Sequence, residues 1–163
     1  MAAIDSIIDE LTLEAKTTRR VLERVPDDRL SWKPHQKSKT IGELSWHLAS
    51  IPKRIATMVQ EDDVDVTTVK AAPMPATVAG ILEEFDREVA DAKELLSQLD
   101  DSALLRETTM RRGEVRMFSG PKAALLRRVM LNHSYHHRGQ LSVYLRLLDV
   151  PVPSVYGPTA DER

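Results

Sequence analysis

The fold is decided by the stretch His133-Ser134-Tyr135-His136-His137-Arg138-Gly139-Gln140, in the middle of the last long helical pattern. Around it, apolar residues recur at helical spacing, namely Leu126, Val129, Met130, Leu141, Tyr144, Leu145 and Leu148. His133 and His137 are four residues apart, so on a helix they share this apolar face. Two neutral imidazoles placed in this way can bind one metal ion. His136 is rotated by about 100° and is expected at the edge of that face.

A third histidine, His47, lies in a second helical pattern. Thr40-Ile41-Gly42-Glu43 has the form of a capping box, so this helix should begin at Thr40 or Ile41. Its apolar stripe consists of Leu44, Leu48, Ile51, Ile55, Met58 and Val59, and Pro52 should bend it. A lone histidine on such a stripe is more often a buried residue bonded to a carbonyl. With the pair in the last helix, His47 favours a metal site, whereas His35 is expected to be exposed.

The remaining patterns predict two more helices. The first helix spans about residues 3–24, and the third runs from near Thr77 to Leu99. Ser119-Gly120-Pro121 should open the last helix, which ends near Leu148. Residues 61–76 form a long acidic and proline-rich connection. We therefore predict an all-α, four-helix bundle, one domain over residues 1–163, with a long crossover between the second and third helices.

Two segments outside these helices carry weaker patterns. Residues 106–118 have no helical period, and Arg112-Gly113-Glu114 could turn a short hairpin between Thr108–Arg111 and Val115–Phe118. The tail from Pro151 to Arg163 should pack back over the bundle and cover a pocket with Val155 and Tyr156. Gly139 inside the last helix suggests that another element approaches closely there.

Composition excludes several classes of protein. The 163 residues carry a formal net charge of −2 with no dominant basic stripe, so no nucleic-acid partner is expected. No apolar run approaches the roughly 18 residues of a membrane span, and no signal peptide is visible, which makes the cytoplasm the expected location. The chain has no cysteine, so disulfides, thiolate zinc sites and iron–sulfur clusters are excluded.

These motifs together resemble the DinB/YfiT-like superfamily of metalloenzymes. His133-Ser134-Tyr135-His136-His137-Arg138-Gly139-Gln140-Leu141 matches its HxxxHRGQ stretch, and Gly42-Glu43-Leu44-Ser45-Trp46-His47-Leu48 matches its second-helix histidine segment. The tail Val152-Pro153-Ser154-Val155-Tyr156-Gly157-Pro158 is also similar. The resemblance implies a four-helix bundle, frequently dimeric, with a divalent ion held by His47, His133 and His137. Nickel or zinc is the expected ion.

Three functions are compatible with this resemblance. The first is a metal-dependent transferase that uses a low-molecular-weight thiol, which fits a chain without its own cysteine. The second is a hydrolase using metal-bound hydroxide. It would need a carboxylate as general base, and the one candidate, Glu43, is better explained by the capping box. The third is a non-catalytic binding or stress-response protein.

Other expectations concern the partners and the residues around the site. We expect a small-molecule substrate and a homodimer, without nucleic acid or membrane, and the catalytic residues are unknown. Arg138 and Gln140 should have structural or supporting roles behind the ligands, for example by bonding the tail or a dimer partner. Tyr135 and Tyr144 could line the pocket or belong to the core.

Overall fold

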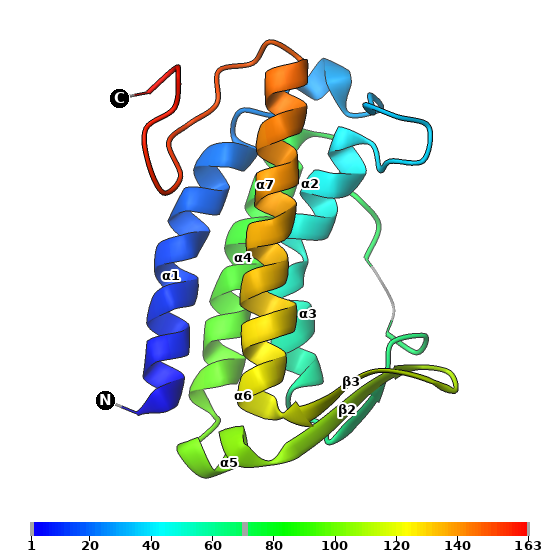
Figure 1. Ribbon diagram of the computed structural model, residues 1–163, viewed down its shortest axis with the longest axis vertical. Helices are drawn as coiled ribbons and strands as arrows, with labels where there is room; N and C mark the ends of the chain where they lie inside the picture. Colours follow the sequence, from blue (N-terminus) through cyan, green and yellow to red (C-terminus); the bar gives the residue numbers. More distant parts are fainter. Residues whose placement is uncertain (1, 70–71, 163) are drawn as a thin grey trace.

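The computed structural model describes residues 2–69 and 72–162 as a bundle of four helical rods with a small sheet at one end (Figure 1). The rods are α1 (Ala3–Leu22), α2 (Ile41–Ala49) continued by α3 (Ile51–Met58), α4 (Val78–Ser97), and the succession α6 (Lys122–Leu125), η2 (Leu126–Leu131) and α7 (Asn132–Leu147). The short elements η1 (Asp27–Arg29) and α5 (Asp101–Leu105) lie in the connections. The predicted bundle is therefore present, with helix bounds close to the predicted ones.

Local sequence signals explain where the helices start. The Thr40 hydroxyl accepts a hydrogen bond from the Glu43 N–H at 3.1 Å, and Glu43 accepts one from the Thr40 N–H at 2.8 Å. The capping box is thus confirmed, and it engages the Glu43 carboxylate. Gly42 is required here because a Cβ would lie 2.8 Å from the Leu30 carbonyl oxygen. Thr77 caps α4 by accepting from the Gly80 N–H at 3.1 Å, and the helix starts near Thr77 as predicted.

The predicted all-α class is incomplete, because three strands form a sheet. β1 (Asp63–Asp65) pairs in parallel with β2 (Glu107–Arg112), which pairs antiparallel with β3 (Val115–Pro121). The predicted hairpin is the β2–β3 pair. β1 escaped prediction because three residues in an acidic connection carry no readable alternation. The fully buried Lys122 fastens the sheet to the bundle, donating to the Gln60 carbonyl at 3.1 Å and pairing with Asp62 at 2.8 Å.

The last rod departs from the prediction in two ways. Ser119 does not cap it, because β3 continues to Pro121 and the helix starts at Lys122. The rod also contains a π-helical segment, η2, directly before α7. Gly139 lies on the solvent side of α7, and a Cβ there would meet no described atom within 4 Å. The prediction of a close approach at Gly139 was therefore wrong.

The long crossover returns the chain to the opposite end of the bundle. In Figure 1, α3 descends to the sheet and α4 starts again at the other end, so both rods run in the same direction. Trp46 donates its indole N–H to the Ala72 carbonyl at 3.1 Å, which holds the returning chain beside α2. The Val78 N–H donates to Asp27 at 2.6 Å. Within the described residues, no helix is long and apolar enough to cross a membrane.

The C-terminal tail packs on the α1 side of the bundle. Arg138 is 2% exposed and pairs with the Glu14 carboxylate at 2.6 Å. It also donates to the Thr18 hydroxyl at 3.2 Å and to the Tyr156 hydroxyl at 2.6 Å. Tyr156 in turn donates to Glu14 at 2.9 Å. The tail therefore packs back as predicted, and Arg138 has the predicted role of bonding it.

Candidate metal centre

Two helices bring the three predicted histidines together. His47 comes from α2, and His133 and His137 come from α7. One candidate ligand nitrogen of each ring lies within 4.8 Å of the other two. The ring centroids are 4.4–5.2 Å apart. Among the described residues, no carboxylate and no fourth histidine joins this cluster. His35 is exposed, as predicted, and His136, which was expected at the edge of the ligand face, is exposed as well.

The π-helical segment η2 determines which face of α7 carries the two histidines. A π turn contains one residue more than an α turn, so the residues after it are rotated by about 100°. Leu126 and Met130 of η2 are fully buried, and His133 and His137 continue on the inward side. Such segments are frequent at functional sites. Sequence periodicity gave no sign of it, because the inward spacing of three or four residues remains compatible with an α-helix.

Hydrogen bonds assign the protons in the cluster. The His137 Nδ1 lies 2.7 Å from the Gln140 Oε1, which can only accept, so Nδ1 carries the proton and donates. The His137 Nε2 therefore has a free lone pair. It lies 2.7 Å from the His133 Nε2, which donates to it. This leaves the His133 Nδ1 as a buried acceptor without a hydrogen-bond partner among the described residues. Gln140 thus has the supporting role that was expected of it.

The surroundings keep the three imidazoles neutral. Burial, followed by the neighbouring charges of His137 and Arg54, lowers the pKa of His47 to about 3. Burial, followed by the charges of His137 and Arg54, lowers the pKa of His133 to about 4. The pKa of His137 is also lowered, again mainly by burial. At neutral pH all three rings therefore present lone pairs, which is the form that binds a metal ion.

The donor set fits a divalent metal ion. Neutral imidazole nitrogens suit zinc, nickel and similar ions. If the proton of His133 resided on Nδ1, its Nε2 would be free to coordinate. The Val129 carbonyl does not form a hydrogen bond with the His133 Nδ1 within the usual geometric limits. It nevertheless acts to raise the pKa of His133, which means that it favours a proton on this ring. A metal ion at Nε2 would therefore fix the proton of His133 on Nδ1, the nitrogen nearest to the Val129 carbonyl.

A cavity of about 350 Å³ opens onto the cluster at His47 and His133. Its other walls come from α3, the crossover, the β2–β3 hairpin and η2, with the residues Arg54, Ile55, Met58, Val66, Val69, Met110, Arg112, Met117 and Val129. The expectation that the tail covers this pocket was wrong, because the tail lies against α1. Tyr135 and Tyr144 also lie elsewhere. Tyr135 donates to Glu10 at 2.6 Å, and the ring of Tyr144 contacts Trp32 at a centroid distance of 5.7 Å.

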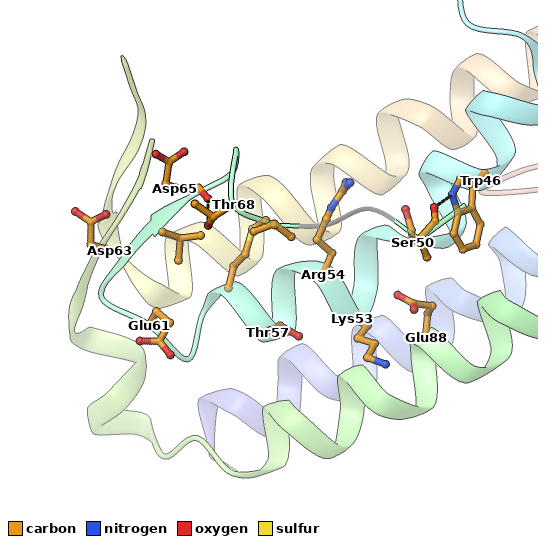
Figure 2. A pocket seen from close by; sticks show the side chains of 14 residues that line it. Trp46, Ser50, Lys53, Arg54, Thr57, Glu61, Asp63, Asp65, Thr68 and Glu88 are labelled. Atoms are coloured by element: carbon orange, nitrogen blue, oxygen red, sulfur yellow. Dashed lines mark hydrogen bonds between the residues drawn. The ribbon is translucent and has the colours of Figure 1, made fainter. Parts of the chain in front are cut away.

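A second cavity, of about 470 Å³, shares Arg54, Met58 and Val69 with the first. Figure 2 shows this cavity between Trp46 and the acidic residues around β1. Arg54 extends from α3 on the side opposite to Lys53 (Figure 2). Lys53 pairs with Asp91 of α4 at 2.7 Å. Arg54 therefore stands at the junction of the two cavities. Sequence reasoning missed it, because an arginine beside an apolar stripe usually lies in solvent.

Fold and cluster define a class of protein, namely helical bundles with a three-histidine cluster between two helices. The model of the DinB family matches residues 3–163, and the chain belongs to this family. It is 24% identical over 163 residues to the uncharacterised protein YrdA of Bacillus subtilis, covering 98% of this chain and 91% of YrdA. The protein YjoA of the same organism is 24% identical over 146 residues, covering 90% of this chain and 91% of YjoA.

Solved structures share the fold. A DinB-like protein from Bacillus cereus superposes with a TM-score of 0.73 at 24% identity, covering 93% of this chain and 97% of that chain. YfiT from Bacillus subtilis superposes with a TM-score of 0.64 at 17% identity, covering 90% and 87%. YfiT is described as a probable metal-dependent hydrolase with an unusual four-helix bundle topology. At these identities, the likeness establishes the fold alone.

Proposed function

We propose that this protein is a metal-dependent transferase, in which His47, His133 and His137 hold one divalent ion, nickel or zinc. The reaction would join a low-molecular-weight thiol to an electrophilic small molecule. One observation carries the proposal: three neutral imidazoles converge at the end of a cavity, and no described carboxylate belongs to the cluster. Three neutral ligands leave the ion its full charge and an open position. An ion there would act as a Lewis acid that promotes deprotonation of a thiol or of water.

The residues around the cluster have distinct roles in this proposal. Gln140 accepts from the His137 Nδ1–H and so directs the Nε2 lone pair toward the site. Arg54 adds a positive charge on the cavity side, close enough to lower the pKa of all three histidines. The apolar walls of the cavity exclude water from the reacting groups.

Two observations bear on the choice between transferase and hydrolase. Among the described residues, no carboxylate lines the cavity next to the histidines, and Glu43 is exposed and engaged in the capping box. No described carboxylate is therefore placed as a general base for water, which favours the transferase. The hydrolase remains the second candidate, because YfiT is described as a probable metal-dependent hydrolase. A non-catalytic binding or stress-response protein is the third.

The expected setting of this activity stays a prediction. It comprises a small-molecule substrate, a homodimer, a cytoplasmic location and the absence of a nucleic-acid partner. The identity of the ion and of the thiol is likewise part of the proposal.

Cobalt substitution tests the role of the thiol. Cobalt–thiolate bonds produce charge-transfer absorption, and the chain has no cysteine, so any such band must come from an added thiol. We expect the band when the cobalt protein is titrated with cysteine, glutathione, bacillithiol or mycothiol. His35→Ala should keep it and His137→Ala should lose it. No band with any thiol, together with ester or amide hydrolysis that disappears in His137→Ala, would favour the hydrolase.

A further inference from the structure

Arg54 is a partly buried cation that pairs with no described residue. It makes no hydrogen bond and no ion pair with any described residue, and burial lowers its pKa. Glu88 attracts it only through a longer-range coulombic interaction. Buried charges in proteins are normally paired, because an unpaired one loses its hydration without compensation. The two fully buried cations among the described residues follow that rule, since Arg138 pairs with Glu14 and Lys122 pairs with Asp62.

The position of Arg54 shows where a missing anion would lie. Its side chain lines the cavity that opens onto His47 and His133. His47 and His133 line the same cavity, so Arg54 and these two histidines face one shared space. Lys53, the preceding residue, points the other way and already pairs with Asp91. An anion in the cavity would therefore meet Arg54 beside the candidate metal centre.

The rest of the cavity suits an apolar group. Apart from the histidines, Arg54 and the exposed Arg112, its lining is entirely apolar, with Ile55, Met58, Val66, Val69, Met110, Met117 and Val129. Three of these residues are methionines, whose flexible side chains adapt to ligands of varied shape. A volume of about 350 Å³ lies within the range of small-molecule sites. With Arg112 exposed, Arg54 is the partly buried arginine of an otherwise mainly apolar cavity, which is complementary to a ligand with one anionic group and a short hydrocarbon body.

We propose that this cavity binds a small amphipathic carboxylate, with its carboxylate on Arg54 and its hydrocarbon body against Met58, Met110 and Met117. That this ligand class is the substrate rests on the proposed metal-dependent function. Arg54 presents two parallel N–H groups that match a carboxylate, and the hydrogen bonds are charge-assisted. The reacting carbon of such a ligand would lie on the histidine side of the cavity. Arg54 is then the residue that selects anionic over neutral substrates.

Methionine methyl groups provide a direct readout of binding. The full chain is labelled with ¹³C-methyl methionine and titrated with hexanoate and with hexanamide, with and without bound zinc. The methyl signals of Met58, Met110 and Met117 should shift, while the exposed Met74 outside the cavity should not. We expect hexanoate to bind about tenfold or more tightly than hexanamide.

Substitutions at Arg54 show whether this residue causes the preference for hexanoate over hexanamide. Arg54→Gln should bring the two affinities to within about twofold, and Arg54→Lys should keep part of the difference. Lys53→Gln is the matched control, one residue away and outside the cavity, and it should keep all of it. The same spectra show whether each variant is folded. If Arg54→Gln does not fold, the comparison of wild type with Arg54→Lys decides.

Three results would overturn the inference. The first is equal affinity of the wild type for hexanoate and hexanamide, or no methyl shift with either. The second is a preference that survives in Arg54→Gln, which would place the anion elsewhere. The third is hexanoate binding only with zinc, which would place the carboxylate on the ion. Failure of the proposed metal function looks different, because the protein would bind no zinc while the zinc-free preference for hexanoate persists.

Discussion

The two sides of α7 differ in whether their buried polar groups have hydrogen-bond or ion-pair partners. On the side of α1 and the tail, Arg138 is fully buried, and Glu14, Thr18 and Tyr156 satisfy its donors. On the side of α2 and α3, the described residues offer no hydrogen-bond partner to the buried His133 Nδ1 and no paired anion to Arg54. His137 and Arg138 are adjacent in sequence, but a helix separates them by about 100°.

This difference separates stability from function. A fully satisfied buried network fixes one arrangement of the elements around it, because breaking any member leaves the others unpaired. Unsatisfied buried groups carry a free-energy cost that a ligand can remove. The Arg138 side therefore holds the tail and α1 in place, whereas the histidine side is where we expect a metal ion and a substrate. Changes on one side should leave the property of the other side largely intact.

The largest expected effect on stability is that of Arg138→Met. The change leaves the Glu14 carboxylate, which is 14% exposed, without its cation. Breaking a buried pair in this way costs about 3–5 kcal/mol in the free energy of unfolding, measured by urea denaturation. The zinc content of the folded fraction should not change. Loss of zinc at temperatures where the variant is fully folded would show that the two sides of α7 are not independent.

Gln140→Leu should weaken metal binding and leave stability nearly unchanged, the reverse of what is expected for Arg138→Met. Without the Oε1 acceptor, the His137 ring loses the hydrogen bond that fixes its tautomer and orientation. Removing such a supporting partner typically weakens metal binding about 10–100-fold, which competition with a chelating dye would measure. Stability without metal should change by less than about 1 kcal/mol, because Gln140 is exposed. The matched control is Gln98→Leu, an exposed glutamine at the end of α4. Unchanged zinc affinity in Gln140→Leu would contradict the assigned tautomer.

Gly139→Ala should have a small and favourable effect. The residue is inside α7 and exposed, and no described atom would contact the added Cβ. Alanine in a helix interior is more stable than glycine by roughly 0.5–1 kcal/mol, which thermal denaturation can measure. Metal affinity should stay the same. A loss of stability instead would mean that this face of α7 packs closely against another molecule, such as a second copy of the chain.

Removing the metal should have the smallest effect on structure. A large apolar core and the Arg138 network hold the bundle without help from the cluster. A chelator should therefore leave the helical circular dichroism at 25 °C intact. It should lower the midpoint of thermal unfolding only as far as the loss of the metal-binding free energy requires. Global unfolding on chelation, as for a zinc finger, would assign the ion a structural role instead.

The sequence was sufficient for the elements with strong local signals. The 3.6-residue period and the Thr40–Glu43 capping box located the helices, and the spacing of His133 and His137 placed both on one inward face. The partnership with His47 could be proposed from its place on a second stripe and from the family motif. Each of these features is encoded within a few neighbouring residues.

Features that depend on distant contacts could not be read in this way. β1 is a strand only because β2 lies beside it, and Ser119 joins β3 instead of capping a helix because Thr109 pairs with it. The π turn depends on how the last rod packs, which a spacing of three or four residues does not reveal. The isolation of Arg54 likewise depends on the crossover and the hairpin, which close the cavity around it.

The central claim is that His47, His133 and His137 form one metal site, and metal stoichiometry by native mass spectrometry tests it most directly. The zinc-loaded protein should carry about one ion per chain, and His47→Ala, His133→Ala and His137→Ala should each lose it under the same conditions. His35→Ala, which removes an exposed histidine outside the cluster, should keep it. Equal zinc content in His137→Ala and wild type would contradict the claim.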